Sequence, residues 1–220
     1  MKIIILLSVL LSIVSCKQKV ISKKGGIDII SNVYVDASKN LENRKSFLIS
    51  RLNYSGDSIV EIVPEPEIPE MSRHLFFIKD SVFYPLEPAG NLLLSEISKK
   101  TKPSLVFDKK AGAIFSKDPI PNYRNRRNLS DTILFNKKFR RFEINSPWNY
   151  TRYYVYPTDT ILPYALYRHA EKDYSGRIER IDSYNKKDDV FVSMQLIPRK
   201  NWDNEAKEIF EFNHFATQRK

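Results

Sequence analysis

The chain has 220 residues, with 36 Lys and Arg against 26 Asp and Glu and a formal net charge of +10. Its hydrophobic content of 42% and aromatic content of 12% exclude an intrinsically disordered chain, and its length suits one globular domain or two small ones. It has a single cysteine, which excludes a scaffold held together by internal disulfides.

The N-terminus carries an export signal that leads to this cysteine. Lys2 precedes an apolar run over residues 3–14, which is shorter than the roughly 20 residues of a membrane-spanning helix and has the length and flanks of a secretory signal. The run leads into Ile13-Val14-Ser15-Cys16, which resembles the lipobox of bacterial lipoproteins. The resemblance implies cleavage before Cys16, attachment of a diacylglycerol to its sulfur, and acylation of the new amine by a fatty chain such as palmitate.

This reading divides the chain into a signal peptide over residues 1–15, a flexible basic tether over 16–26 and one globular envelope domain over 27–220. The tether "KQKVISKKGG" has four lysines and no acid, and lysines near anionic headgroups add roughly 1 kcal/mol each. In enterobacteria an aspartate directly after the lipidated cysteine favours the inner membrane. Lys17 occupies that position here, so the expected location is the outer membrane, facing the periplasm.

The first part of the domain predicts strands. Residues 27–38, "IDIISNVYVDAS", are rich in β-branched types, and residues 59–63, "IVEIV", alternate as a strand does. Residues 39–52 fit a short helix or the first arm of a hairpin equally well, because short apolar runs are ambiguous by periodicity. The prolines of "PEPEIPE", residues 64–70, predict an extended connector, since proline lacks an N–H donor.

Downstream, an apolar run, a polar turn and a second apolar run recur, which predicts serial β-hairpins. The four segments with this pattern are residues 74–86, 104–115, 132–144 and 177–197. Residues 90–101 predict a short helix with basic residues at its C-terminal end.

The C-terminal segment 201–216, "NWDNEAKEIFEFNHFA", predicts an amphipathic helix with acids in its first turn. Its apolar face contains Trp202, Ala206, Ile209, Phe210 and Phe215. Together these elements predict an α+β fold, predominantly an antiparallel sheet of serial hairpins with a C-terminal amphipathic helix.

One segment is a candidate for contact with an anionic surface. Residues 123–142 hold seven Lys or Arg against one Asp, interleaved with aromatic rings. Arginines bind phosphate or carboxylate through paired donors, and rings stack on sugars. The alternative is a solvated hairpin at a sheet edge, where lysines prevent aggregation. The seven cations are Arg124, Arg126, Arg127, Lys137, Lys138, Arg140 and Arg141.

The sequence does not indicate catalysis. His74, His169 and His214 lie on three separate predicted elements, without the i, i+4 spacing of a metal-binding helix. There is no Gly-rich phosphate loop, and the mature chain would have no thiol nucleophile. We therefore expect no metal, no cofactor and no catalytic residues. A tyrosine-rich stretch, residues 149–174, fits either a glycan- or partner-binding surface or an ordinary amphipathic strand.

The leading hypothesis is a membrane-anchored envelope lipoprotein that acts as a non-enzymatic binding or scaffold module. The alternative is a lipid or lipoprotein carrier, like the half-barrel outer-membrane acceptor of lipoproteins, and the third hypothesis is a hydrolase of envelope polymers. Expected partners are the membrane, through the N-terminal lipid, and an envelope protein, glycan or anionic lipid. Nucleic acid is not expected, because an exported lipoprotein rarely meets it. An apolar cavity of several hundred Å³ under the sheet would favour the carrier.

Overall fold

The computed structural model describes residues 19–65, 73–87 and 93–218. The expected signal peptide, Cys16 and most of the proline-rich connector lie outside these ranges. Of the segment expected to form a tether, residues 20–21 form a short strand and residues 24–26 begin a long one.

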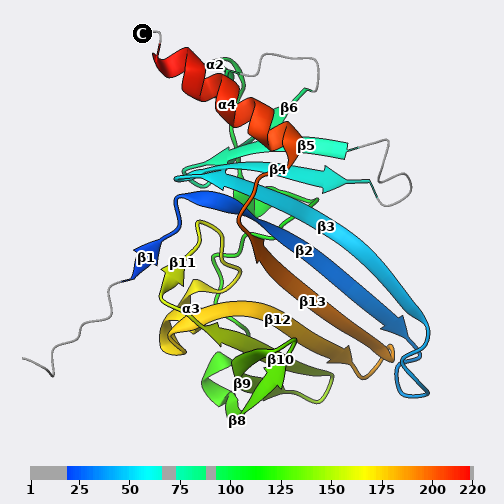
Figure 1. The fold of residues 1–220 in the computed structure, drawn as a ribbon. Coiled ribbons are helices and arrows are strands. Elements are labelled where there is room, and N and C mark those ends of the chain that lie inside the picture. Colours follow the sequence, from blue (N-terminus) through cyan, green and yellow to red (C-terminus); the bar gives the residue numbers. More distant parts are fainter. Residues whose placement is uncertain (1–18, 66–72, 88–92, 219–220) are drawn as a thin grey trace, which may run out of the picture.

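The described residues form one large antiparallel sheet with helices, which confirms the predicted α+β class (Figure 1). The sheet has 11 strands in the order β7-β6-β5-β4-β3-β2-β13-β12-β10-β9-β8. These strands are β2 (Lys24–Val35), β3 (Arg44–Ser55), β4 (Ser58–Pro64), β5 (Arg73–Lys79), β6 (Val82–Leu86), β7 (Ser104–Leu105), β8 (Arg127–Leu134), β9 (Lys137–Asn145), β10 (Asn149–Pro157), β12 (Gly176–Asn185) and β13 (Val190–Arg199).

The remaining elements lie at the ends and on the faces of this sheet. A two-stranded parallel pair is formed by β1 (Val20–Ile21) and β11 (Thr160–Ile161). The helices are α2 (Leu94–Lys100), α3 (Arg168–Asp173) and α4 (Asn204–Gln218), and the 3-10 turns are η1 (Val106–Asp108) and η2 (Tyr123–Asn125). The expected short helix and the expected C-terminal helix are therefore both present.

Tight turns connect two pairs of neighbouring strands. The turn between β5 and β6 has positive φ angles at Asp80 and Ser81, and the turn between β8 and β9 has them at Phe135 and Asn136. Two successive positive φ angles match the twist of antiparallel strands and give tight hairpins. The sheet is then completed by β13, which pairs with β2 along its whole length, so the last strand lies in the middle of the sheet.

The secondary structure of two segments became clear only from the structure. Residues 39–52, which fitted a helix or a strand, contribute to strand β3. The hairpin predicted at residues 104–115 is wrong. Only Ser104 and Leu105 pair with β6, after which the chain turns under the sheet and buries Val106 and Ala113 in its core. Apolar side chains in this segment serve as core residues of an irregular loop.

The outer face of the sheet is the face that carries α4. Val60, Ile62 and Phe77 on β4 and β5 pack against Ile209 and Phe210 of the helix. Figure 1 shows α4 lying across the β4–β6 end of the sheet, far from β8 and β9.

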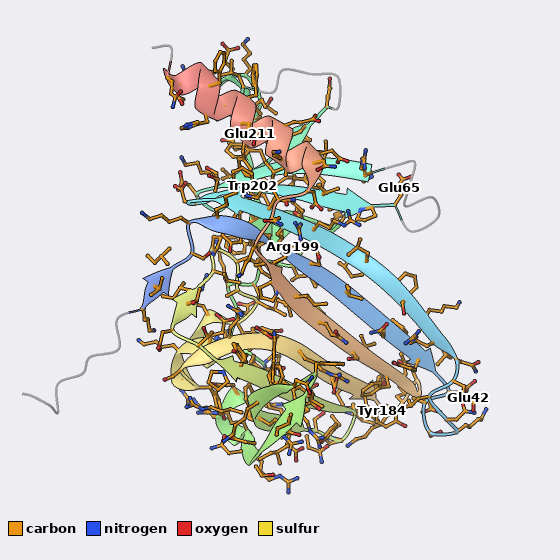
Figure 2. The ribbon with its side chains drawn as sticks, in the orientation of Figure 1. Glu42, Glu65, Tyr184, Arg199, Trp202 and Glu211 are labelled. Atoms are coloured by element: carbon orange, nitrogen blue, oxygen red, sulfur yellow. The ribbon has the colours of Figure 1, made fainter. Side chains whose placement is uncertain are left out.

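The start of α4 is held by a polar network at the junction with β13. The Trp202 indole donates to the backbone carbonyl of Tyr54 (2.8 Å). Asp203 accepts from Asn53 (2.9 Å) and from Arg199 (2.6 Å). Figure 2 shows Arg199 and Trp202 at the point where the chain leaves β13 for the helix.

The inner face of the sheet is the opposite face, and it is covered by irregular chain. Residues 106–115 and 162–164 pack on Ile27, Ile29 and Leu52, while η2 and α3 cover Phe142 and Tyr153. Among the residues that the structure describes, no helix is long and apolar enough to cross a membrane.

Candidate functional site

A mainly apolar row, which includes the buried polar residue Ser31, crosses the inner face of the sheet from β3 to β9. Register places Phe47 opposite Ser31, Ser31 opposite Met194, and Met194 opposite Ile181, and the row continues to Tyr153 and ends at Phe142. The β9 end of this row is buried, whereas Met194 is half-buried and Phe47 is 36% exposed. The row therefore becomes accessible at its β3 end.

At this end the structure has a pocket, which we call the rim pocket. Strand β3 pairs with β2 from Arg44 onward but with β4 only from Arg51 onward, so within the described residues the first half of β3 has no strand partner on its β4 side. The pocket beside it has a volume of about 400 Å³, which is within the range of ligand sites. It is lined by Ser46, Phe47, Leu48, Ile49, Val63, Pro64, Glu65, His74, Ala111 and Gly112, and most of these side chains are apolar.

The floor of the rim pocket is fastened by a buried ion pair. Glu61 is fully buried on the inner face of β4, and Lys109, in the loop beneath the sheet, donates to its carboxylate. The carboxylate also accepts from the Ser50 hydroxyl (2.7 Å) and the Ala113 amide (2.6 Å). Gly112 has φ +79° and lies so close to Glu61 that a Cβ there would collide with it. The loop can therefore approach the sheet only with glycine at this position.

The stability of the fold depends on the pairing of these two buried charges. Burial lowers the pKa of Lys109, and the adjacent Glu61 carboxylate offsets part of that effect. Charges are costly to bury unless they are paired and hydrogen-bonded. Sequence reasoning missed this pair. Its one signal in the sequence was the single acid in "IVEIV", and Lys109 could not be recognised as its partner because it lies 48 positions further along the chain.

The seven cations proposed as surface contacts do not form one patch. Arg127 donates to the nearly buried carboxylate of Glu143 on the outer face, where Lys137 binds Glu179 at 3.0 Å. Arg140 instead donates to the backbone carbonyl of Tyr174.

The other four cations each have different neighbours. Arg126 lies 4.0 Å from the centroid of the Tyr123 ring, Lys138 is 3.1 Å from Asp131, Arg141 donates to the Ser130 carbonyl (2.9 Å), and Arg124 is exposed on η2. Contact with an anionic surface stays a prediction for all seven.

The outer face of β8–β12 has alternating charges across neighbouring strands. Register places Arg127 opposite Glu143, Glu143 opposite Arg152, and Arg152 opposite Asp182. Burial raises the pKa of Glu143, but hydrogen bonds from Tyr150, Arg127 and Arg152 outweigh it, so the net pKa is lowered. These four side chains therefore neutralise one another across the outer face.

The histidines lie apart, each with its own neighbours. His169 packs edge-on against the Tyr123 ring and accepts a long hydrogen bond from the Ile120 amide (3.4 Å). His74 lies 3.5 Å from Glu65 at the rim pocket, with both side chains exposed, and His214 contacts Gln218 on α4. Within residues 19–65, 73–87 and 93–218, no group of three or more His, Cys, Asp or Glu is placed to hold a metal.

No protein-family model and no curated protein sequence matches the chain. Among solved structures, it is similar to LolA superfamily protein NE2245 from Nitrosomonas europaea, with a TM-score of 0.29 and 10% identity over 82% of this chain and 87% of that one. It is also similar to LprF from Mycobacterium bovis, with a TM-score of 0.32 and 9% identity over 82% and 88% of the two chains. Similarities with TM-scores of this size do not establish a family or a function for this chain.

Proposed function

We propose that this protein is a lipid-anchored envelope protein that binds a lipid, or the acyl chains of a lipoprotein, on the inner face of its curved sheet. The observation that carries the proposal is the apolar row that opens into the rim pocket at Phe47. The non-enzymatic binding class expected from the sequence includes this role. The carrier hypothesis, which was the alternative, is the more specific one, and an apolar pocket at the sheet favours it.

The pocket suits an acyl chain for physical reasons. Each methylene that leaves water contributes about 0.8 kcal/mol, so about ten methylenes provide a gross gain of about 8 kcal/mol against the cost of association. The half-buried side chains of Val33, Val192 and Met194 extend the apolar inner surface beyond the pocket. A ligand entering past Phe47 can therefore continue along the sheet.

The test measures acyl-chain binding by the mature chain carrying Cys16→Ala, so that no attached lipid competes. Phe47→Glu would place a charge in the rim pocket and should weaken binding of a pyrene-labelled phospholipid about tenfold or more. The matched control is Phe212→Glu on the outer side of α4, where Phe212 is 44% exposed against 36% for Phe47. Equal binding by the two variants would reject the rim pocket as the lipid site.

The anchor has its own test. Cys16→Ala should release the protein from membranes or leave the precursor uncleaved, because no diacylglycerol can be attached. A palmitate analogue that still labels the Ala variant would contradict lipidation at Cys16. This result is independent of the rim pocket.

A further inference from the structure

A second pocket lies at the opposite end of the inner face, beside the start of the mature chain. It has a volume of about 560 Å³ and lies between residues 157–162, helix α3 and the start of β12. Lys19 is part of its wall. The chain after Lys19 is held there by β1, where Val20 donates to the Asp159 carbonyl and Ser22 to the Ile161 carbonyl, each at 3.0 Å.

Positive charge is gathered in this pocket from four separate segments. Five cations line it, against the two acids Asp159 and Glu171, which leaves a formal excess of three positive charges. The cations are Lys19, Arg140, Arg168, Lys172 and Arg177.

The arginines of this pocket are already engaged with protein groups, whereas the two lysines are exposed. Arg177 binds Glu179 through Nη2, but its buried Nε has no hydrogen-bond partner. Arg168 donates to the Leu162 carbonyl (3.0 Å) and lies 3.7 Å from Glu171. Within the described part of the chain, the exposed amines of Lys19 and Lys172 have no acidic partner.

We propose that this pocket binds the phosphate of an anionic phospholipid headgroup in the membrane that holds the protein. Arginine forks and lysine ammonium groups together are suited to phosphate oxygens, and the volume exceeds that of a phosphate alone. The proposal does not depend on the rim pocket, but it does rest on the predicted lipid anchor at Cys16.

Chain length and exposed apolar side chains favour a membrane source for the phosphate. Lys19 is three positions after Cys16, so a fully extended chain places the pocket wall within about 11 Å of the anchor, at the depth of the headgroups. Beside the pocket, Val20 and Ile21 of β1 are 58% and 69% exposed. Exposed apolar residues next to cations are typical of a surface that contacts a membrane.

The experiment uses the mature chain with Cys16→Ala and sedimentation with vesicles of phosphatidylcholine, with or without phosphatidylglycerol. Lys19→Gln combined with Lys172→Gln should weaken binding to the anionic vesicles on the order of 30-fold. The control removes two other exposed lysines, by Lys45→Gln and Lys200→Gln, and should leave most of the binding intact. Equal losses in both double variants, or no binding by the parent chain, would overturn the proposal.

Two further arms identify the source of the phosphate and separate the pockets. Replacing Val20 and Ile21 with Ser should also weaken vesicle binding, while glycerol phosphate should compete only weakly. If glycerol phosphate binds as tightly as vesicles and the Ser variant behaves like the parent, the site takes a soluble phosphate and the headgroup assignment is wrong. Binding of the pyrene-labelled phospholipid is compared between Phe47→Glu and Phe212→Glu, and binding of anionic vesicles between the two lysine double variants, so failure of one proposed site does not imply failure of the other.

Discussion

The two halves of the sheet are covered differently. In the half around β4 and β5, which we call the closed half, both faces are covered, the outer one by α4 and the inner one by the loop that carries Lys109. In the half formed by β8, β9, β10 and β12, which we call the open half, the inner face is covered by α3 and η2. Its outer face carries the alternating charges of Arg127, Glu143, Arg152 and Asp182.

The sequences of the strands reflect this difference. Strand β4, "SIVEIVP", is buried over five successive residues, because side chains on both of its faces leave water. Strand β9, "KKFRRFEIN", instead mixes exposed cations with the buried rings of Phe139 and Phe142. The buried carboxylate of Glu61 on β4 therefore needs a buried cation, Lys109. The carboxylate of Glu143 on β9 pairs instead with the exposed side chain of Arg127.

Removing α4 should have the largest effect, because it would uncover the outer face of the closed half. Trp202, Ile209 and Phe210 together contribute about 5–9 kcal/mol if each contributes 1.5–3 kcal/mol, against a total stability of about 5–15 kcal/mol. We expect truncation before Trp202 to give an unfolded or aggregating chain in thermal melts.

A pair of point variants sharpens this test within one helix. Phe210→Ala should lower the free energy of unfolding by about 3–5 kcal/mol, since Phe210 is 7% exposed. Phe212→Ala, two residues along and 44% exposed, should cost less than about 1 kcal/mol. Similar losses would mean that α4 does not pack as described.

On the inner face of the same half, Lys109→Met should cost about 3–5 kcal/mol, because it leaves the buried Glu61 carboxylate without its cation. Urea unfolding monitored by tryptophan fluorescence measures the loss. The double variant with Glu61→Gln should recover part of it, since no charge is then buried. If the double variant is less stable than Lys109→Met, the cost does not come from an unpaired charge.

On the inner face of the open half, stability should depend on the ionisation of Glu171. Burial raises the pKa of Glu171 from 4.5 to about 7, although Arg168, the Ile178 amide and Arg177 act in the opposite direction. The folded state therefore binds this proton more tightly than the unfolded chain. The contribution is fully present below pH 4.5 and is lost as the pH rises through 7, a change of about 3 kcal/mol.

Comparison with Glu171→Gln isolates that contribution, because all other titrating groups are shared. The difference in unfolding free energy between the two proteins, measured from pH 4 to pH 8, should favour the variant progressively as the pH rises. A difference that is constant with pH would contradict a raised pKa at Glu171.

The smallest effect is expected at the exposed β8–β9 hairpin of the open half. Lys138 and Asp131 are 3.1 Å apart with side chains 70% and 44% exposed, so a double-mutant cycle with alanine should give a coupling of about 0–1 kcal/mol that decreases with salt. A coupling as large as that of the Glu61–Lys109 pair would remove the proposed distinction between the two halves.

The sequence alone determined the features that depend on neighbours along the chain. The resemblance to a lipobox at Cys16 comes from a contiguous segment. The hairpins over residues 74–86 and 132–144, the α+β class and the helix near Trp202 follow from turn chemistry and from periodicities of two and 3.6 residues. All of these patterns are complete within about 20 residues.

Tertiary structure decided everything that joins distant segments. Pairing of β13 with β2 places residues 190–199 beside residues 24–35, and the loop after β7 turns inward because Glu61 and the core accept it. The rim pocket and the pocket at Lys19 each combine segments more than 60 residues apart. Such sites arise only when the sheet curves and its faces are covered, and no local period in the sequence encodes which segment covers which face.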